Sequence, residues 1–579
     1  MQRRSVLKTM TGAALIPVVA GCTDSGSGSS SPSSSSSSSK TYSLDFNSSS
    51  YTTLTKTVNT GSGSKKVTYR FYKNNVYVQH PVNYKYQSLN VSVPVAIDGK
   101  AVDATRAPIM FAINVGGYTS SSTWGATAQG GGMSAGSFGG GFGSGKSSSG
   151  STPAGGSGSG APSGSAPPGG GAGGAAAGAS SAGLGSSMGS YWSSYDNGET
   201  ALAHGYVVVE PGCRGRDQKW SGSNGTYYGK APAAIVDLKA ALRYLRHNKD
   251  RIPGNKDWII TSGGSAGGAL SALVGASGNS TLYDAELKAL GAADADDNVF
   301  LSACYSPITD LEHSDGQYEW MWGTLTYQSM GGPGSSSSSP TSSASSGSST
   351  VDQTISGVLK KQFTSYLQQL ALPGINGFGT LTTDNYSSYM MKEYLIPAAT
   401  TALTKTLTAS ERTSYLKKNT WITWSGGKAT FTWEDFLKHV GTRMKTAPAF
   451  DTFDLSAAEN IEYGNATTNA RHFTLYSLRH ASGNSSARLD SDLPAKLNQM
   501  NPMYHLENKN PSRARHWWLR TGTLDTNTSH TVVCNLAAIT TRLGDEVNSA
   551  LYWDGGHAVN YDAPALFTWI TKLTGYSVA

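Results

Sequence analysis

The stretch that decides the fold is Trp258–Leu270, with the sequence WIITSGGSAGGAL. Its apolar beginning predicts a buried strand, and the residues after Ser265 predict a helix. The turn between them has the pattern Gly-x-Ser-x-Gly, with Gly263 and Gly267 on either side of the serine. Both positions need glycine because so sharp a strand-to-helix turn leaves no room for side chains. The turn presents the Ser265 hydroxyl at a helix N-terminus, where the backbone N–H of Ala266 can face a developing oxyanion.

A serine hydroxyl in this setting needs a base, and His557 is the candidate. It follows the last predicted strand, Ala550–Trp553, in the glycine-containing loop Asp-Gly-Gly-His near the C-terminus. Two other histidines of the C-terminal part fit less well, because His516 begins a predicted strand and His530 begins a predicted helix. A loop histidine without a role is the alternative.

The third group of such a relay is an acid that orients the histidine, and the order along the chain is Ser, Asp, His. Asp525 follows the predicted strand His516–Arg520 at the end of the turn TGTLD. Asp554 and Asp562 compete for this role, but they lie three and five residues from His557. Since a separate strand end is the more usual source of the acid, the sequence favours Asp525.

A second oxyanion donor is expected in a loop after an early strand. The segment Asn114–Tyr118, NVGGY, comes at the end of the predicted strand Pro108–Val115. Gly116 or Gly117 would offer a backbone N–H with no side chain in the way. A plain glycine turn is the alternative interpretation of this pair.

Short apolar runs alternate with helical patterns, which is typical of an α/β protein with a mostly parallel central sheet and flanking crossover helices. The predicted strands are Pro108–Val115, Tyr206–Glu210, Trp258–Thr261, His516–Arg520 and Ala550–Trp553. Ala233–Arg246 has apolar residues at helical spacing and is predicted to pack on the sheet. At 579 residues, the chain is long enough for a catalytic domain with a large insertion.

The sheet-forming patterns fall into two parts, residues 41–285 and 514–579. Residues 286–513 between them show helical and irregular patterns, which predict an inserted cap (lid) domain. Ser- and Gly-rich stretches interrupt the chain at 120–190 and at 331–350. The first falls between two predicted strands and is interpreted as a disordered insertion in a surface loop, which costs little because loop-closure entropy grows slowly with length.

The first 22 residues predict an export signal, because Arg3 and Arg4 precede an apolar run, Thr11–Ala20, that is too short to span a bilayer. The arginine pair resembles a twin-arginine signal, and Val-Ala-Gly-Cys22 resembles a lipobox, whose cysteine is lipidated. A cleaved signal peptide with an incidental cysteine is the alternative. Both interpretations place the mature protein outside the cytoplasm, as a membrane-anchored lipoprotein of the cell envelope or a secreted protein, with the Ser-rich segment 23–40 as a tether.

Charge and cysteine content argue against several other functions. The net charge is only +7, and no basic patch with interleaved aromatic residues is present, so nucleic acid is not an expected partner. After Cys22, the remaining cysteines are Cys213, Cys304 and Cys534, which are too few and too widely spaced for a disulfide framework or a metal cluster. Buried free thiols are expected, although one disulfide remains possible. The predicted serine chemistry needs no metal or organic cofactor.

Beyond these motifs, the chain resembles the bacterial tannase and feruloyl-esterase group, also called subtype B tannases. The segments that carry the resemblance are Asn114–Tyr118, Tyr206–Arg216 (YVVVEPGCRGR), Gly267–Ser280 (GGALSALVGASGNS) and Arg520–Asp525 (RTGTLD). It covers most of the chain outside the low-complexity runs. The resemblance implies an α/β-hydrolase fold with a large inserted cap and a catalytic triad of Ser265, Asp525 and His557.

The same resemblance implies that polar residues of the cap hold an aromatic acyl group. In the tannases a lysine, a glutamate and an aspartate contact the three hydroxyls of the galloyl ring, and by spacing Lys445 and Glu459 correspond to the first two. The third position falls two residues after Asp525, where this chain has Asn527. This departure weakens the case for gallate, because a neutral amide replaces a carboxylate acceptor. A solvated pair for Lys445 and Glu459, and support of the Asp525 turn by Asn527, are the alternatives.

The sequence therefore predicts a serine esterase that acts on small-molecule esters of hydroxylated aromatic acids through an acyl-enzyme. A serine peptidase of the oligopeptidase-related group shares the Gly-x-Ser-x-Gly turn and the order of the triad. Such a peptidase normally carries a propeller or similar gating domain, and no blade repeat is found in the sequence. A catalytically inactive surface-binding protein would be favoured by loss of a triad member, and all three candidates are present. The sequence carries no indication of oligomeric state.

Overall fold

The computed structural model of the chain describes residues 40–61, 63–124, 197–221, 225–327 and 349–578. Residues 41–579 form one compact unit. The predicted signal peptide with Cys22 lies outside the described residues, as do the tether up to residue 39 and most of the two Ser/Gly-rich stretches.

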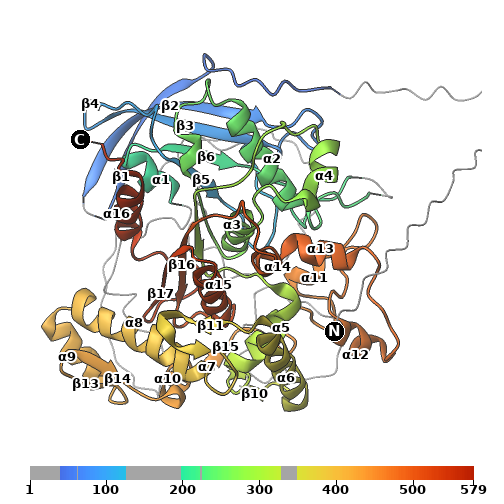
Figure 1. Cartoon of the computed structure of the whole chain (residues 1–579), viewed down its shortest axis with the longest axis vertical. Coiled ribbons are helices and arrows are strands. Elements are labelled where there is room, and N and C mark those ends of the chain that lie inside the picture. The colour runs from blue at the N-terminus through green and yellow to red at the C-terminus, as the bar shows by residue number, and fades with distance from the viewer. Residues whose placement is uncertain (1–39, 62, 125–196, 222–224, 328–348, 579) are drawn as a thin grey trace, which may run out of the picture. The chain divides into compact units, whose positions relative to one another are not determined.

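A mixed sheet forms the centre of this unit (Figure 1). In the described part of the chain its ten strands are β1 (Thr52–Asn59), β2 (Ser64–Val76), β3 (Ser88–Ile97), β4 (Lys100–Ala101), β5 (Ile109–Ile113), β6 (Val207–Pro211), β7 (Ile259–Gly264), β8 (Leu301–Tyr305), β16 (His516–Gly522) and β17 (Glu546–Tyr552). Their order across the sheet is β1-β2-β3-β6-β5-β7-β8-β16-β17, with β4 paired to β3. Strands β6 to β17 pair in parallel, whereas β1 to β4 add an antiparallel part. Because parallel strands end at one edge, the loops that follow β5, β7, β8, β16 and β17 lie at the same edge.

Alternation of side chains decides which face of the sheet each strand residue covers. On β6, Val207 and Val209 belong to one hydrophobic core and Val208 to another. On β16, Trp517 packs in the first core and Trp518 in the second. Both faces of the sheet are therefore covered, as parallel strands require.

Helices supply the apolar cover on each face. Those that contribute to the first core are α2 (Ala233–His247), α3 (Ala266–Ala276), α4 (Asp284–Ala289) and α15 (His530–Arg542). Those that contribute to the second are α1 (Gly198–Ala203) and α16 (Ala563–Thr574). The predicted helix Ala233–Arg246 is confirmed as α2, and each of the five predicted strands overlaps a strand of the central sheet.

Residues 306–515, between β8 and β16, are called the inserted region, and its described parts, 306–327 and 349–515, are largely helical. Its described helices are α5 (Leu311–Trp322), α6 (Gln353–Leu370), α7 (Tyr386–Met390), α8 (Ile396–Thr401), α9 (Ala409–Lys418), α10 (Trp433–Val440), α11 (Ala458–Glu462), α12 (Leu475–Ser482), α13 (Leu493–Met500) and α14 (Pro502–Glu507). Its described strands are β9 (Thr326–Tyr327), β10 (Ser349–Thr350), β11 (Pro373–Gly374), β12 (Gly379–Thr380), β13 (Thr423–Ser425), β14 (Lys428–Thr430) and β15 (Thr442–Arg443). These strands pair among themselves and not with the central sheet.

The predicted start of the cap at residue 286 differs from the structure, because β8 lies in the central sheet between β7 and β16. The sequence of β8, LSACY, lacks the β-branched residues that usually mark a buried strand. It can be buried because the hydroxyl of Ser302 donates to the carbonyl of Ser271 at 2.9 Å. The sequence also gives little indication of the antiparallel strands β1 and β2, because Lys, Ser and Thr dilute their apolar pattern.

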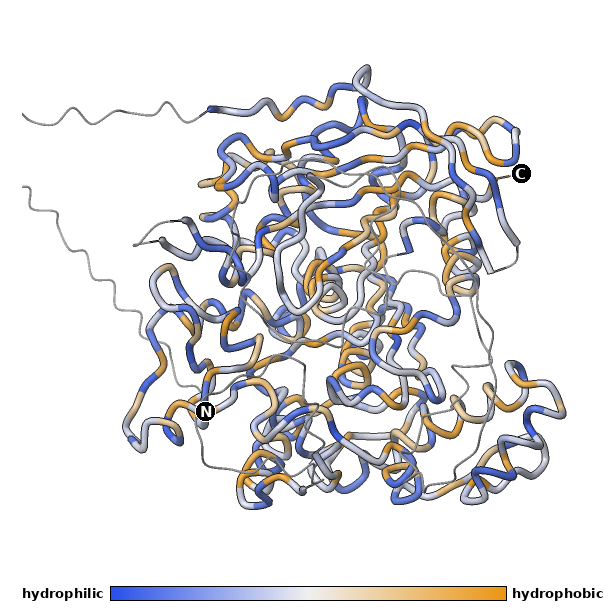
Figure 2. The backbone as a smooth tube through the Cα atoms, turned by 180° about the vertical axis from the view of Figure 1, so that it is seen from behind, coloured by the Kyte–Doolittle hydropathy of each residue, from blue (hydrophilic) through white to orange (hydrophobic). Residues whose placement is uncertain are grey.

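Hydrophobic residues concentrate along the central strands, which appear orange in Figure 2. Among the described residues, no helix has both the length and the apolar character that a membrane crossing requires. Cys213, Cys304 and Cys534 are free and buried, as the sequence predicted. Burial raises the pKa of the Cys304 thiol to about 12, so this thiol is neutral at physiological pH.

Candidate active site

Ser265 lies in the sharp turn between β7 and α3, with φ 59° and ψ −124°. Such a backbone conformation is strained for a residue with a side chain. A Cβ on Gly263 would lie 2.5 Å from the carbonyl oxygen of Gly267, and one on Gly267 would lie 2.8 Å from that of Ile113. The two glycines of the motif are therefore required by close backbone packing, which holds the serine in its strained position.

Two further side chains form a hydrogen-bonded relay with Ser265. His557 Nε2 lies 2.9 Å from Ser265 Oγ. His557 Nδ1 lies 2.9 Å from Asp525 Oδ2 and 3.0 Å from Asp525 Oδ1. A carboxylate at Nδ1 favours the tautomer with the proton on that nitrogen, which leaves Nε2 free to accept the serine proton.

Asp525 is buried in the turn that follows β16. Burial alone would raise the pKa of its carboxyl, but His557 and hydrogen bonds from Ser306 and the N–H of Asn527 lower it to about 2. The N–H of Asn527 donates to Asp525 Oδ1 at 2.9 Å, and the Thr521 hydroxyl donates to Oδ2 at 3.2 Å. The carboxylate is thus ionised at neutral pH and fixed in orientation.

The competing acids bind other partners. Asp554 accepts the Tyr415 hydroxyl at 2.7 Å and lies 2.7 Å from His439 Nε2. Asp562 accepts from Arg520 Nε at 2.9 Å and from the hydroxyl of Tyr552. Among the described hydrogen bonds, only Asp525 of the three candidate acids meets His557.

The two rejected histidines also lie elsewhere. His516 begins β16 and lies 3.5 Å from Glu546. His530 begins α15 and is buried against Trp322, with ring centroids 4.9 Å apart. Burial lowers the pKa of His530 to about 4, so its ring is neutral at physiological pH.

The loop after β5 places backbone N–H groups next to the serine turn. The N–H of Gly267 donates to the carbonyl of Val115 at 2.9 Å, which joins the two segments. Gly117 has φ +54°, and its carbonyl accepts from Arg216 Nε. Within the described parts of the chain, the N–H groups of Gly116, Gly117 and Ala266 donate to no protein acceptor. All three are thus able to bind a charged oxygen from a ligand.

Ser306 is a residue of this site that the sequence did not indicate. It follows β8 with φ 46°, and its hydroxyl accepts the N–H of Ala558 at 2.9 Å. The same hydroxyl lies 3.1 Å from Thr521 Oγ1, beside Asp525. Ser306 therefore ties the loop of His557 to the strand of Asp525. The sequence gives no clear sign of β8, and this strand is what places Ser306 at the same sheet edge.

The loop that carries Asp525 and the loop that carries His557 also contact each other through their backbones. A Cβ on Gly522 would lie 2.1 Å from the carbonyl oxygen of Gly555. The N–H of Leu524 donates to that carbonyl at 2.9 Å, and the N–H of Thr523 donates to the carbonyl of Tyr552 at 2.9 Å. Only glycine fits at position 522 without displacing the neighbouring loop.

The predicted binding residues Lys445 and Glu459 form a pair in the inserted region. Lys445 Nζ lies 3.8 Å from Glu459 Oε1 and 3.7 Å from the centre of the Phe450 ring. The Tyr318 hydroxyl accepts the N–H of Lys445 at 3.2 Å and donates to the carbonyl of Thr526 at 2.6 Å. Tyr318 therefore connects the Lys445 segment to the turn between Asp525 and the half-buried Asn527.

Glu459 also interacts electrostatically with Tyr118 and Arg216. Burial raises the pKa of Tyr118 well above its usual value, and the carboxylates of Glu462 and Glu459 add to this rise. Burial lowers the pKa of Arg216, and the same two carboxylates oppose that change. Since Arg216 binds the carbonyl of Gly117, Glu459 of α11 is electrostatically coupled to the Gly116-Gly117 loop.

Glu462 is a second buried acid near this loop. Among the described residues, its carboxylate has no hydrogen-bond partner. Burial raises its pKa to about 8, against the opposing effects of Arg216 and Lys230. Glu462 is therefore largely protonated at neutral pH.

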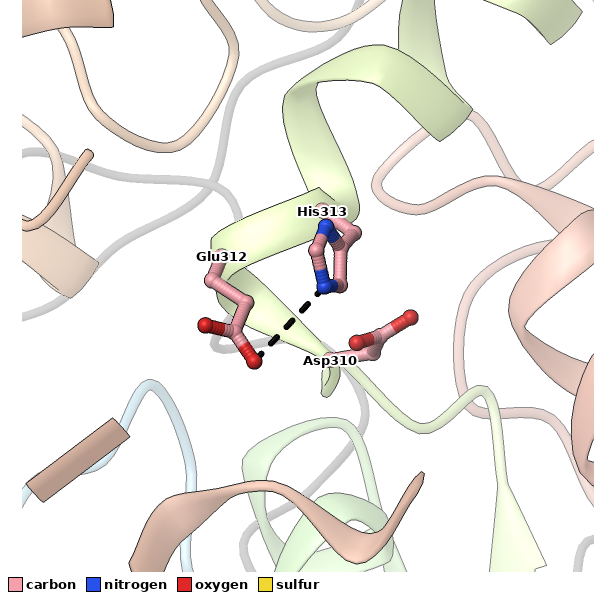
Figure 3. Close-up of side chains that lie close together, drawn as sticks. All are labelled: Asp310, Glu312 and His313. Atoms are coloured by element: carbon pink, nitrogen blue, oxygen red, sulfur yellow. Dashed lines mark ion pairs between the residues drawn. The ribbon is translucent and has the colours of Figure 1, made fainter. Parts of the chain in front are cut away.

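A further group of polar side chains, Asp310, Glu312 and His313, lies at the start of α5 (Figure 3). Glu312 Oε1 and His313 Nε2 are 3.7 Å apart. The two oxygens of Asp310 accept from the side-chain amides of Asn501 at 2.9 Å and Gln317 at 2.8 Å. Because Asn501 precedes α14 and also donates to Glu312 at 2.9 Å, this group anchors α14 to α5.

Comparisons with known proteins agree with this arrangement. The BD-FAE family model matches residues 193–344. The structure of tannin acyl hydrolase from Lactobacillus plantarum is 30% identical, with a TM-score of 0.66, over 92% of this chain and 99% of that chain. Fusobacterium nucleatum tannase is 31% identical, with a TM-score of 0.67, over 92% of this chain and 100% of that chain.

Shorter matches link the chain to other esterases. The esterases LipC and LipQ of Mycobacterium tuberculosis are 45% identical over 56 residues and 38% identical over 90 residues. These alignments span 14% and 20% of the two curated relatives. The full-length likeness is thus to the tannases, and the chain belongs to the bacterial tannase and feruloyl-esterase group of carboxylic ester hydrolases.

Proposed function

We propose that this protein hydrolyses esters of hydroxylated aromatic acids through an acyl-enzyme, with an α/β-hydrolase core and the inserted region as its cap. The observation that carries the proposal is the relay from Asp525 through His557 to Ser265, with hydrogen bonds of 2.9 to 3.0 Å. The same atoms in the same order serve acyl transfer in other serine hydrolases.

In the first half-reaction, Ser265 Oγ bonds to the ester carbonyl carbon while His557 Nε2 takes the hydroxyl proton. Ionised Asp525 stabilises the resulting imidazolium. The carbonyl oxygen becomes an oxyanion and receives hydrogen bonds from the N–H of Ala266 and of Gly116 or Gly117. When the bond to the alcohol breaks, His557 donates its proton to the leaving oxygen. A water molecule then attacks the acyl-enzyme with His557 as base, which releases the acid and restores Ser265.

The acyl group would contact Lys445 and Glu459 of the inserted region and Asn527 beside Asp525. Lys445 and Glu459 offer a cation and an anion, and Asn527 offers a neutral amide two residues from Asp525. Phenolic hydroxyls can donate to a carboxylate and accept from an ammonium group, so this set suits a hydroxylated ring. The likeness to tannin acyl hydrolases in complex with ethyl gallate and with 3,4-dihydroxybenzoate supports the same substrate class.

The chain would act outside the cytoplasm. The arginine pair, the short apolar run and Cys22 support export and lipid anchoring of a cell-envelope protein. The test is metabolic labelling with a clickable fatty acid in a bacterial host, with Cys22→Ser as the matched control. Label on the wild type but not on the variant supports the anchor, and equal absence of label contradicts it.

The central experiment compares wild type and Ser265→Ala of residues 41–579 on methyl gallate, methyl ferulate and p-nitrophenyl acetate. We expect hydrolysis of the aromatic esters by the wild type and none above background by the variant. Equal circular dichroism spectra would show that the variant is folded. Hydrolysis that survives in Ser265→Ala, or a folded wild type inactive on every ester, would contradict the proposal.

A further inference from the structure

We infer that the inserted region holds the loop of His557 in its working position through Asp554, which makes Tyr415 and His439 positioning residues for the reaction. The inference rests on the proposed role of His557 as the base. It gives the inserted region a task besides contact with the substrate.

One buried carboxylate of the histidine loop binds two side chains of the inserted region. Asp554 lies three residues before His557, and its side chain is 1% exposed. Its Oδ2 accepts the Tyr415 hydroxyl at 2.7 Å, and its Oδ1 lies 2.7 Å from His439 Nε2. Tyr415 is on α9 and His439 is on α10, so both partners of the carboxylate belong to the inserted region.

The residue before Asp554 is bound to the same two side chains. The indole N–H of Trp553 donates to the Tyr415 hydroxyl at 2.8 Å. The rings of Trp553 and His439 are nearly parallel, with an interplanar angle of 7° and centroids 5.8 Å apart. Two consecutive residues of the histidine loop therefore depend on Tyr415 and His439.

The backbone of Asp554 is strained, which explains why it needs support. Its φ is 54°, a left-handed conformation that is costly for a residue other than glycine. Its N–H donates to Thr523 Oγ1 at 2.8 Å, next to the acid-bearing turn. Asp554 is thus held from the sheet by its backbone and from the inserted region by its side chain. If the side-chain contacts are lost, the residue can relax toward an ordinary conformation and carry His557 with it.

Small movements of this loop matter because the relay is short. The bond from His557 Nε2 to Ser265 Oγ is 2.9 Å long. A misplacement of about 1 Å can reduce the rate of a positioned reaction by about 100-fold. A partial relaxation, with the Thr523 contact still present, is expected to lower kcat by about tenfold.

The test uses the full chain with Tyr415→Phe, His439→Ala and His439→Gln. A fluorophosphonate probe counts the reactive Ser265 in each preparation, so that kcat for p-nitrophenyl acetate can be given per reactive site. We expect Tyr415→Phe and His439→Ala each to lower kcat per site by about tenfold while KM stays within about twofold. His439→Gln keeps a donor near the position of Nε2 and should recover most of the rate.

Glu393→Gln is the matched control, because Glu393 lies in the inserted region but contacts Asn376 and Lys392 instead of the histidine loop. It should leave kcat unchanged. Thermal unfolding identifies variants that are merely less stable, and Tyr415→Phe removes a single oxygen atom from an otherwise unchanged side chain.

The outcomes separate this inference from the proposed function. Normal kcat per site in both Tyr415→Phe and His439→Ala would overturn the inference. Failure of His439→Gln to recover more rate than His439→Ala would overturn the role of the Nε2 contact. A wild type that neither reacts with the probe nor hydrolyses the ester would overturn the proposed function itself.

Discussion

At the ends of β7, β16 and β17 the backbone positions the proposed reacting groups, whereas in the inserted region buried polar side chains hold the elements together. The serine turn has no room for a Cβ at Gly263 or Gly267. In the inserted region, by contrast, Arg443 and Glu319 form an ion pair in which both side chains are fully buried. Close backbone packing tolerates almost no change, while polar contacts can be altered one at a time. We therefore expect changes at the strand ends to abolish activity. Changes in the inserted region should have smaller effects, on the rate where a side chain contacts the histidine loop and on specificity where it contacts the substrate.

The largest effect is expected for Asp525→Asn at the end of β16. The amide cannot stabilise the imidazolium and favours the wrong tautomer of His557, so kcat should fall by about 10³- to 10⁴-fold with the fold retained. The check is steady-state hydrolysis of methyl gallate together with the circular dichroism spectrum. A decrease in kcat of less than tenfold would contradict the proposed relay of Asp525, His557 and Ser265.

A smaller and selective effect is expected for Lys445→Met in the inserted region. Loss of the ammonium group beside Glu459 should raise KM for methyl gallate by about tenfold or more and leave p-nitrophenyl acetate nearly unaffected. Lys438→Met, on the exposed side of α10, is the control. Equal losses on both esters would mean that Lys445 supports the fold instead of the substrate.

Asn527→Asp tests the position where the two regions meet. A carboxylate there would accept from a third phenolic hydroxyl, so the ratio of kcat/KM for methyl gallate to that for methyl ferulate should rise by about three- to tenfold. The backbone N–H of residue 527, which binds Asp525, is unchanged by the substitution. An unchanged ratio would remove Asn527 from the set of specificity residues.

The smallest effect concerns stability and comes from Glu462. The unfolded chain loses this proton near pH 4.5, whereas the folded protein keeps it up to about pH 8. Between these values the folded state binds more protons, so the stability contributed by Glu462 falls as pH rises through this window. Glu462→Gln should therefore melt at least about 2 °C above the wild type at pH 9, with a smaller difference at pH 5. The same difference in melting temperature between variant and wild type at both pH values would mean that Glu462 is in a more polar environment than the structure shows.

How far the sequence predicts these features depends on whether the signal is local. The serine turn, Asp525 and His557 each stand next to an apolar run that marks a strand, so their positions at one sheet edge could be predicted. Ser306 could not, because the strand before it contains Ser and Cys where a typical buried strand has Val or Ile.

The contacts of the inserted region are harder to predict for a different reason. Asp554 is separated from Tyr415 by 139 residues and from His439 by 115 residues, and no local pattern links them. From sequence alone, Asp554 was a competing acid for the relay. Its burial against α9 and α10 depends on how the inserted region packs, which periodicity does not reveal.

The contact between Gly522 and Gly555 has a consequence for engineering by segment exchange. Since a Cβ at position 522 would lie 2.1 Å from the carbonyl of Gly555, the two loops fit each other only as a matched set. A chimaera that imports one loop from a relative must import the other or keep both glycines. Residues 522–525 and 552–557 must therefore be exchanged together, although α15 and most of β17 lie between them in the sequence.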